Sequence, residues 1–132
     1  MTLRYLLDTD TASFAIRGVG RVKDSILSHT PAEVAISALT EAELWFGVKK
    51  LGSRRLQRSV EAFLGGMQVL PFDRVAARDF GDVQALLAAR GRPIGAVDAM
   101  LAAHARSRVL TFVTHNRRHF DRVPRLKVED WV

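Results

Sequence analysis

The chain contains no cysteine, and this absence excludes disulfides, thiol catalysis and cysteine-ligated zinc. It also has no apolar run close to the roughly 20 residues that a membrane-spanning helix needs. Met1 to Arg4 lead straight into a predicted strand and leave no room for a signal peptide. We therefore expect a cytoplasmic protein that does not contact a membrane.

Acidic residues are fewer than basic ones. The 132 residues include 20 Lys and Arg against 14 Asp and Glu, which gives a formal net charge of +6. A basic surface attracts polyanions through counterion release, although an arginine-rich, solubilising surface explains the same numbers equally well. The apolar fraction of 48% and the chain length are those of one globular domain, which we expect to span residues 1–132.

Short strand-like runs alternate with longer helical patterns along the chain. Strands are predicted at 3–7, 33–36, 67–70, 109–114 and 126–128, and helices at 10–17, 22–29, 40–51, 54–64, 71–89 and 96–107. This alternation indicates βαβ units, so we expect an α/β fold whose mostly parallel central sheet has helices on both faces. In open parallel sheets, ligands bind at the carboxyl ends of the strands.

The stretch RYLLDTDT, at residues 4–11, holds two acids. Asp8 ends the first strand, where a carboxylate needs a partner or a cation unless it is a plain strand end. Asp10 stands where a helix N-cap belongs. The pattern is also similar to the first motif of haloacid-dehalogenase-type phosphatases, with Asp8 as nucleophile. Their second acidic pair has only Asp79 and Asp82 as candidates, which we expect to face solvent on a helix, so this alternative is the weaker one.

Two more acids begin helices on the carboxyl side of predicted strands. Glu43 lies early in helix 40–51, where the alternative is a capping box with Thr40. Asp98 shares a face of helix 96–107 with apolar residues, and burying a carboxylate there is costly unless it is paired or ligates a metal. An interaction with the helix dipole is the alternative for Asp98.

The predicted sheet edge thus gathers the three carboxylates of Asp8, Glu43 and Asp98, followed by Asn116 and His119 after a later strand. Carboxylate oxygens suit a hard cation such as Mg²⁺ or Mn²⁺. Such an ion activates water and neutralises a phosphodiester. A basic protein with an acidic metal site is typical of a nuclease.

Four fragments, in order and at this spacing, resemble the PIN-domain family, and in particular its VapC-type ribonuclease toxins. They are LLDTDTAS, ISALTEAELWFG, PIGAVDAMLAAHA and FVTHNRRHFDRVPRLKVEDW. The resemblance covers essentially the whole chain. It implies a Mg²⁺- or Mn²⁺-dependent endoribonuclease that cleaves structured RNA such as tRNA, forms a homodimer, and is inhibited by a cognate VapB-like antitoxin. In the family, the acids matching Asp8, Glu43 and Asp98 hold the metal.

The chain departs from the family pattern at one position. Asn116 matches the usual asparagine, but His119 stands where many members have a fourth acid, with Asp121 as a fallback acid. A neutral imidazole can still ligate a metal or hold a water, yet one negative charge is lost and a second metal is weakened. A PIN scaffold that has lost catalysis and only binds RNA or an antitoxin is therefore the alternative function. His104 does not stack with Asp98 and is expected to be structural or at the surface.

Arginines lie beside the predicted site. Arg117 and Arg118 fall between Asn116 and His119, where a cation would contact a scissile phosphate. Arg54 and Arg55 could extend this RNA-binding track, and a solvated helix face is the alternative for both pairs.

Overall fold

The structure is a computed structural model that describes residues 2–132, and it contains a five-stranded parallel sheet of order β3-β2-β1-β4-β5. The strands are β1 (Tyr5–Leu7), β2 (Val34–Ser37), β3 (Gln68–Leu70), β4 (Thr111–Val113) and β5 (Val128–Glu129). The central strand is β1, whose Leu6 pairs with Ala35 of β2 and Phe112 of β4. All four pairings are parallel, which confirms the predicted α/β class.

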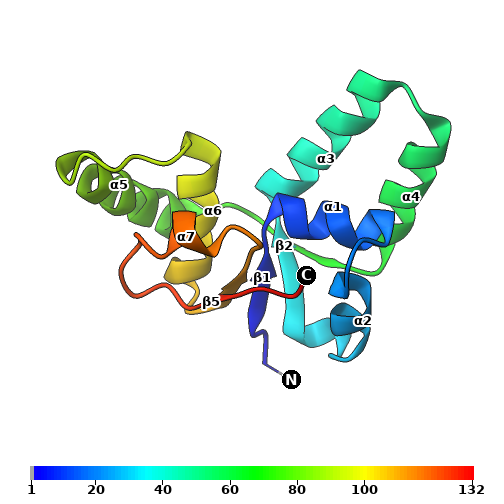
Figure 1. Cartoon of the computed structure of the whole chain (residues 1–132), viewed down its shortest axis with the longest axis horizontal. Helices are drawn as coiled ribbons and strands as arrows, with labels where there is room; N and C mark the ends of the chain where they lie inside the picture. The colour runs from blue at the N-terminus through cyan, green and yellow to red at the C-terminus, as the bar shows by residue number, and fades with distance from the viewer. Residues whose placement is uncertain (1) are drawn as a thin grey trace.

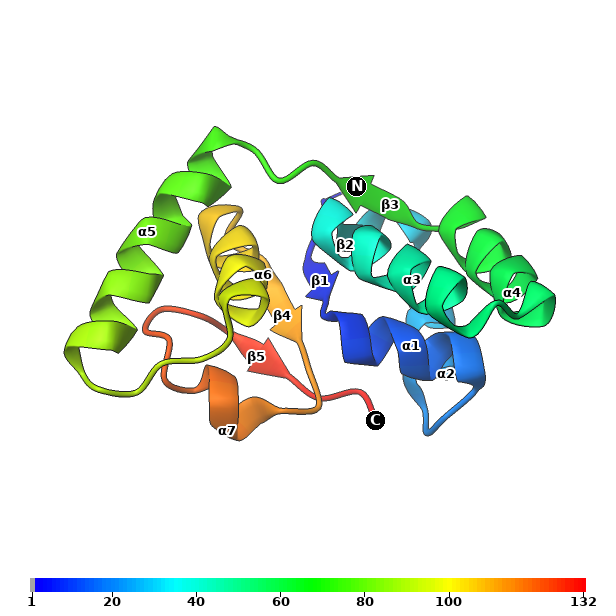
Figure 2. The same ribbon diagram turned by 90° about the horizontal axis from the view of Figure 1, so that it is seen from above.

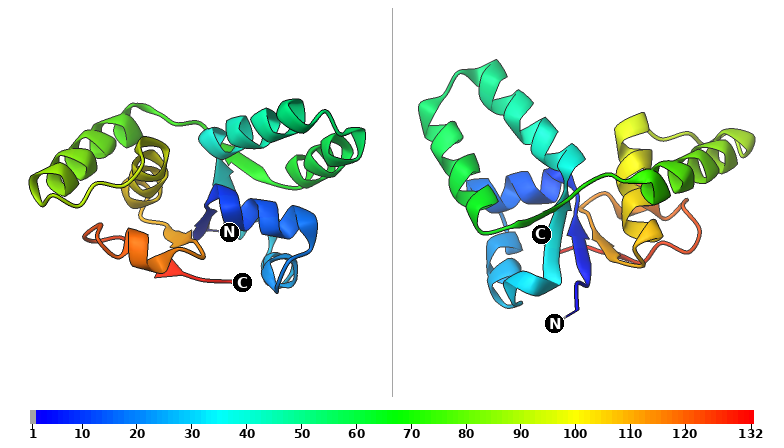
Figure 3. Two further views of the ribbon diagram at one scale, coloured as in Figure 1. Left: turned by 45° about the horizontal axis from the view of Figure 1, so that its top comes forward. Right: turned by 180° about the vertical axis from the view of Figure 1, so that it is seen from behind.

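Helices cover both faces of this sheet, as expected (Figures 1 and 3). They are α1 (Thr9–Arg17), α2 (Val22–Leu27), η1 (Pro31–Glu33), α3 (Ala38–Leu51), α4 (Arg54–Gly65), α5 (Arg74–Ala89), α6 (Ala96–Ser107) and α7 (Arg117–Phe120). Figure 2 shows α5 and α6 beside each other on one side of the sheet, and α1 to α4 on the other. No helix among residues 2–132 is long and apolar enough to cross a membrane.

Alternation along β1 decides which core each side chain joins, because successive residues of a strand point to opposite faces. Leu6 packs into the cluster formed with α5 and α6, which includes Val83, Leu87, Leu101 and Ala102. Tyr5 and Leu7 point the other way, into the cluster formed with α1 and α2, which includes Ala12, Ala15 and Val22. A central parallel strand buried on both faces explains the unbroken apolar run before Asp8.

Three predicted helix starts are wrong, and one of them is that of α5, which begins at Arg74 with Asp73 as its N-cap rather than at residue 71. Asp8, not Asp10, is the N-cap of α1, since its Oδ1 accepts a hydrogen bond from the Thr11 amide at 2.8 Å. Ser37 caps α3 in the same way, with its Oγ 3.1 Å from the Leu39 amide. Helices α1 and α3 therefore start directly after their strands, and Thr40 lies inside the first turn of α3 rather than in a capping box with Glu43.

The expectation that Asp79 faces solvent is also wrong. Its two carboxylate oxygens accept hydrogen bonds from Arg106 Nε at 2.9 Å and Nη2 at 2.7 Å. This pair joins α5 to α6, and both side chains are largely buried. Asp82 is exposed, as expected. The second acidic pair that a phosphatase would need is therefore divided between a structural ion pair and the surface.

His104 is structural, which is one of its two expected roles. It is 1% exposed and its Nδ1 lies 2.9 Å from Ser37 Oγ, so it links α6 to the start of α3. Burial lowers the pKa of His104, an effect that Asp73 opposes and Arg108 adds to.

Candidate acidic site at the carboxyl edge of the sheet

Asp8 occupies the carboxyl end of the central strand. Its backbone N–H donates to the Val113 carbonyl at 2.9 Å, which fixes it beside the end of β4. The side chain is 6% exposed, and burial raises the pKa of its carboxyl group. Hydrogen bonds from Thr114 and Thr11 oppose that rise, and the nearby charge of Asp10 adds to it. A negative charge is thus held at a place where it is poorly solvated.

Asp98 approaches this edge from the first turn of α6, and its side chain is 46% exposed. Burial raises the pKa of its carboxyl group, the charge of His119 lowers it, and that of Asp10 raises it. His119 Nε2 lies 3.7 Å from Asp98 Oδ2. Asp10 therefore acts on both Asp8 and Asp98, a position that its predicted role as a cap did not anticipate.

Glu43 reaches the same edge from α3 and is tied to the residue that follows Asp8. Its Oε1 accepts a hydrogen bond from the Thr9 hydroxyl at 2.5 Å, and that hydroxyl lies 3.0 Å from Thr40 Oγ1. These contacts join the starts of α1 and α3. The Glu43 side chain is exposed, so it faces the solvent that a substrate would displace.

Asn116 and His119 lie on the fourth segment of the edge. The backbone N–H of Asn116 donates a hydrogen bond to Thr114 Oγ1 at 3.0 Å, and this contact starts the turn into α7. One turn later, α7 presents His119 to Asp98, while Phe120 is buried against Phe112. The packing of Phe120 thus holds His119 at the site.

The donor groups have the chemistry of a hard-cation site, because they are carboxylate oxygens. Burial raises the pKa of both Asp8 and Asp98, and the charge of Asp10 adds to the rise at each. Within residues 2–132, however, no three Asp, Glu or His side chains come close enough together to hold a metal ion as they stand. Each acid is instead engaged by a protein donor: Asp8 by Thr11, Glu43 by Thr9, and Asp98 faces His119.

The predicted arginines lie in two separate places. Arg117 and Arg118 are exposed on α7, beside the acidic site. Arg54 and Arg55 begin α4, beyond the far end of α3 (Figure 1). Because α3 has 14 residues, its two ends are about 20 Å apart. The structure therefore does not join the two pairs into one continuous track.

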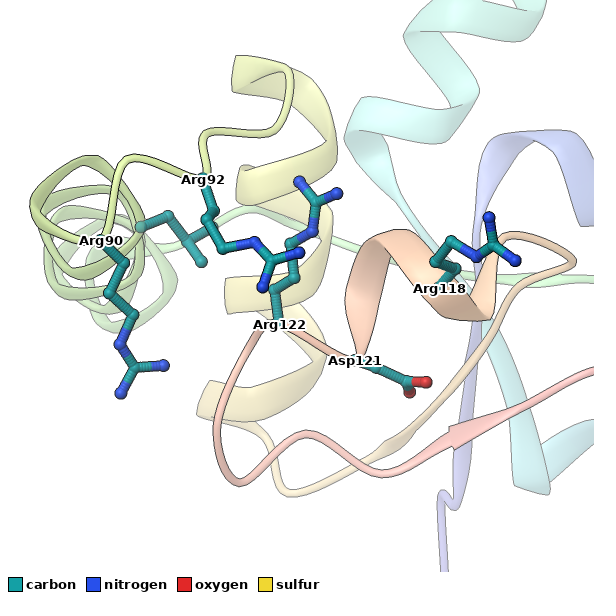
Figure 4. A pocket seen from close by; sticks show the side chains of 6 residues that line it. Arg90, Arg92, Arg118, Asp121 and Arg122 are labelled. Atoms are coloured by element: carbon teal, nitrogen blue, oxygen red, sulfur yellow. The ribbon is translucent and has the colours of Figure 1, made fainter.

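Asp121 does not join the acids. It is exposed and lines a cleft together with Leu87, Arg90, Arg92, Arg118 and Arg122. Figure 4 shows its carboxylate beside α7, pointing away from the arginine head groups. The sequence contained one sign of this cleft, the RGR run at 90–92 just before α6.

A parallel sheet of this order, with the carboxylates of Asp8, Glu43 and Asp98 at the helix starts on its carboxyl edge, defines an α/β protein with an acidic candidate site. A family model described as PIN domain matches residues 5–126, so the chain belongs to the PIN-domain family.

Three similar proteins extend this comparison. The chain is 38% identical over 130 residues to the "tRNA(fMet)-specific endonuclease VapC" of Salmonella typhimurium, covering 98% of each chain. It is similar, at 36% identity and a TM-score of 0.90, to a chain in the crystal structure of DNA-bound VapBC from Salmonella typhimurium, with 99% of this chain and 100% of that one covered. A chain in the Rickettsia felis VapBC2 structure, bound to a promoter DNA fragment, has 28% identity and a TM-score of 0.90, with 98% and 100% covered.

Proposed function

We propose that this chain is a metal-dependent endoribonuclease, the toxin of a VapBC-type toxin–antitoxin pair. One observation carries the proposal: Asp8, Glu43 and Asp98 lie at one sheet edge in a chain that matches a VapC endonuclease over 98% of both lengths. The proposal treats residues 1–132 as one PIN domain.

Asp8, Glu43 and Asp98 would hold Mg²⁺, with Mn²⁺ as a substitute, since all three offer carboxylate oxygens. When bound, such an ion stabilises charge on the scissile phosphate and lowers the pKa of water. The Thr11 amide orients the Asp8 carboxylate, and the Thr9 hydroxyl orients that of Glu43.

Of the remaining residues at the edge, Asn116 and the two arginines act on the substrate, and His119 acts on the Asp98 carboxylate. Asn116 has its amide side chain exposed beside the edge and can donate a hydrogen bond to a phosphate oxygen. His119, in contact with Asp98, orients that carboxylate and weakens the binding of a second cation, because an imidazole stands in place of a fourth acid. Arg117 and Arg118 attract the phosphate backbone to the site.

The substrate and partner follow from the similar proteins. Since one relative is named as a tRNA(fMet)-specific endonuclease, structured RNA such as tRNA is the proposed substrate. Since two solved relatives are VapBC complexes, a VapB-like antitoxin is the proposed inhibitor. The proposed working form is a cytoplasmic homodimer.

The test is cleavage of total cellular RNA by the purified protein, with Mg²⁺, with Mn²⁺ or with a chelator, followed by mapping of new ends. We expect discrete cuts that need the metal and become at least about 100-fold slower in Asp98→Asn, because even the loss of a residue that only hydrogen-bonds to a metal ligand costs about 10–100-fold. Asp82→Asn removes the same charge from the exposed face of α5 and should cut like the wild type. Equal cutting by Asp98→Asn would contradict the proposed site.

A specific observation supports one second candidate, the catalytically silenced scaffold. His119 occupies the position facing Asp98 where a further acid would otherwise add to the donor set. If no cuts appear with either metal while the protein still binds RNA or an antitoxin, this candidate replaces the first. His119→Glu would then be expected to restore cleavage.

A further inference from the structure

Four arginines line one cleft of about 630 Å³ next to the acidic site. Arg90 and Arg92 come from the segment between α5 and α6, whereas Arg118 lies on α7 and Arg122 just after it. Leu87 is the apolar residue of the lining and Asp121 its carboxylate. The volume is within the range of clefts that bind ligand-sized groups, about 300–1,000 Å³.

Among the described residues, these guanidinium groups have no acidic partner. In the described part of the chain, none of the four lies within 4.0 Å of a carboxylate, unlike Arg4 and Arg106, which are both paired. The guanidinium groups of Arg92 and Arg122 point into the same space (Figure 4), where their like charges repel each other, and the single Asp121 cannot offset both. This excess of positive charge favours an anionic ligand with several charges.

The cleft is lined by residues that adjoin those of the acidic site in the chain. Arg118 is the neighbour of His119, which faces Asp98, and Arg92 lies on the segment that leads into the first turn of α6. In Figure 4, Arg92 and Arg122 reach into the space beside α6, and Arg118 extends from α7 toward the side where β1 meets α1. Arg90 points away from the other three. Arg118 thus lies on the side of the cleft toward the acidic site, and Arg92 and Arg122 lie on the other side.

We propose that this cleft binds the backbone phosphates of the RNA strand on one side of the bond to be cut. The inference rests on the proposed function, since it takes RNA as the substrate. The planar guanidinium binds two phosphate oxygens at once, which fixes the strand without reading its sequence. The acids of the site repel a polyanion, so a neighbouring cationic cleft is needed to hold the strand over them.

The experiment measures binding of purified bulk tRNA as a function of salt, in an Asp98→Asn background with chelator present. We compare Arg92→Gln/Arg122→Gln with Arg74→Gln/Arg78→Gln, which removes two exposed charges from α5 outside the cleft. Each lost phosphate contact lowers the slope of log K against log [salt] by roughly 0.7–0.9. We expect the cleft variant to lose about 1.4–1.8 of this slope and the α5 variant to keep it.

Three further results decide the inference. Arg92→Lys/Arg122→Lys should keep the slope, because it keeps both charges. An unchanged slope in the Gln variant overturns the inference. If that variant has also lost binding of an acidic polypeptide such as polyglutamate, the cleft belongs to a protein partner instead. RNA cleavage is measured separately, with the chain that keeps Asp98. If this chain cuts RNA but the Gln variant shows no change of slope, only the phosphate-binding role of the cleft is refuted. If the slope changes but the chain with Asp98 does not cut RNA, only the proposed nuclease activity is refuted.

Discussion

Lowering the pH should reduce the free energy of unfolding of this protein through protonation of His104, at a pH above that at which the Asp and Glu side chains are protonated. His104 is 1% exposed, its Nδ1 lies 2.9 Å from Ser37 Oγ, and its ring meets Phe72 edge to face at 5.4 Å. Burial lowers its pKa below the ordinary 6.5, Asp73 opposes this effect and Arg108 adds to it. Between the two pKa values, the unfolded chain binds a proton at His104 that the folded chain does not.

The sign and size of the effect follow from this difference in proton binding. The contribution of His104 to the free energy of unfolding is fully present above the pKa that His104 has in the unfolded chain. It is lost as the pH falls from there toward the lower pKa that His104 has in the folded chain. One proton difference gives at most about 1.4 kcal/mol per pH unit. For a chain of this length, about 3–5 °C of Tm corresponds to each kcal/mol, so the loss approaches about 4–7 °C per pH unit.

Chemical denaturation at pH 7.5, 6.5 and 5.5 measures this slope. His104→Asn keeps an amide where Nδ1 stands and cannot take the proton, so it should flatten the dependence in this range. His115→Asn, at a largely exposed histidine paired with Asp130, is the control and should keep the wild-type slope. An equally steep slope in His104→Asn would refute the assignment of the acid sensitivity to this residue.

Three shorter predictions concern other groups. Asp8→Asn should abolish RNA cleavage, because it removes a proposed metal ligand. It keeps an N-cap but removes a buried charge, so the free energy of unfolding at pH 7, measured by thermal unfolding, should rise by about 0.5–2 kcal/mol; a lower free energy of unfolding would contradict this. Asp79→Asn leaves Arg106 without its carboxylate and should cost about 1–3 kcal/mol in urea, whereas an unchanged midpoint would mean that the pair is energetically neutral. His119→Glu adds a carboxylate beside Asp98 and should tighten Mn²⁺ binding in a calorimetric titration; equal affinity would remove position 119 from the cation site.

The sequence alone was enough for the order of the five strands and of helices α1 to α6, because hydrophobic periodicity is a local property. It did not predict the short helices η1 and α7, which have too few residues to show a period. Helix 96–107 has the bounds predicted for it, and each of the five predicted strands is present, with shorter or shifted ends. The positions of Asp8, Glu43 and Asp98 at one sheet edge could also be predicted, since in a parallel sheet the carboxyl ends of the strands share an edge. Their roles as metal ligands remain a prediction.

Only the tertiary structure decided which residues act together across long distances in the chain. Asp8 rather than Asp10 caps α1 because pairing with Val113 of β4 sets where the first strand stops. Asp79 meets Arg106 because α5 packs on α6. The arginine cleft arises in the same way, from two segments, 90–92 and 118–122, that helix packing brings to one place. Periodicity predicts the face that a residue occupies on its own helix, but packing determines which other segment that face meets.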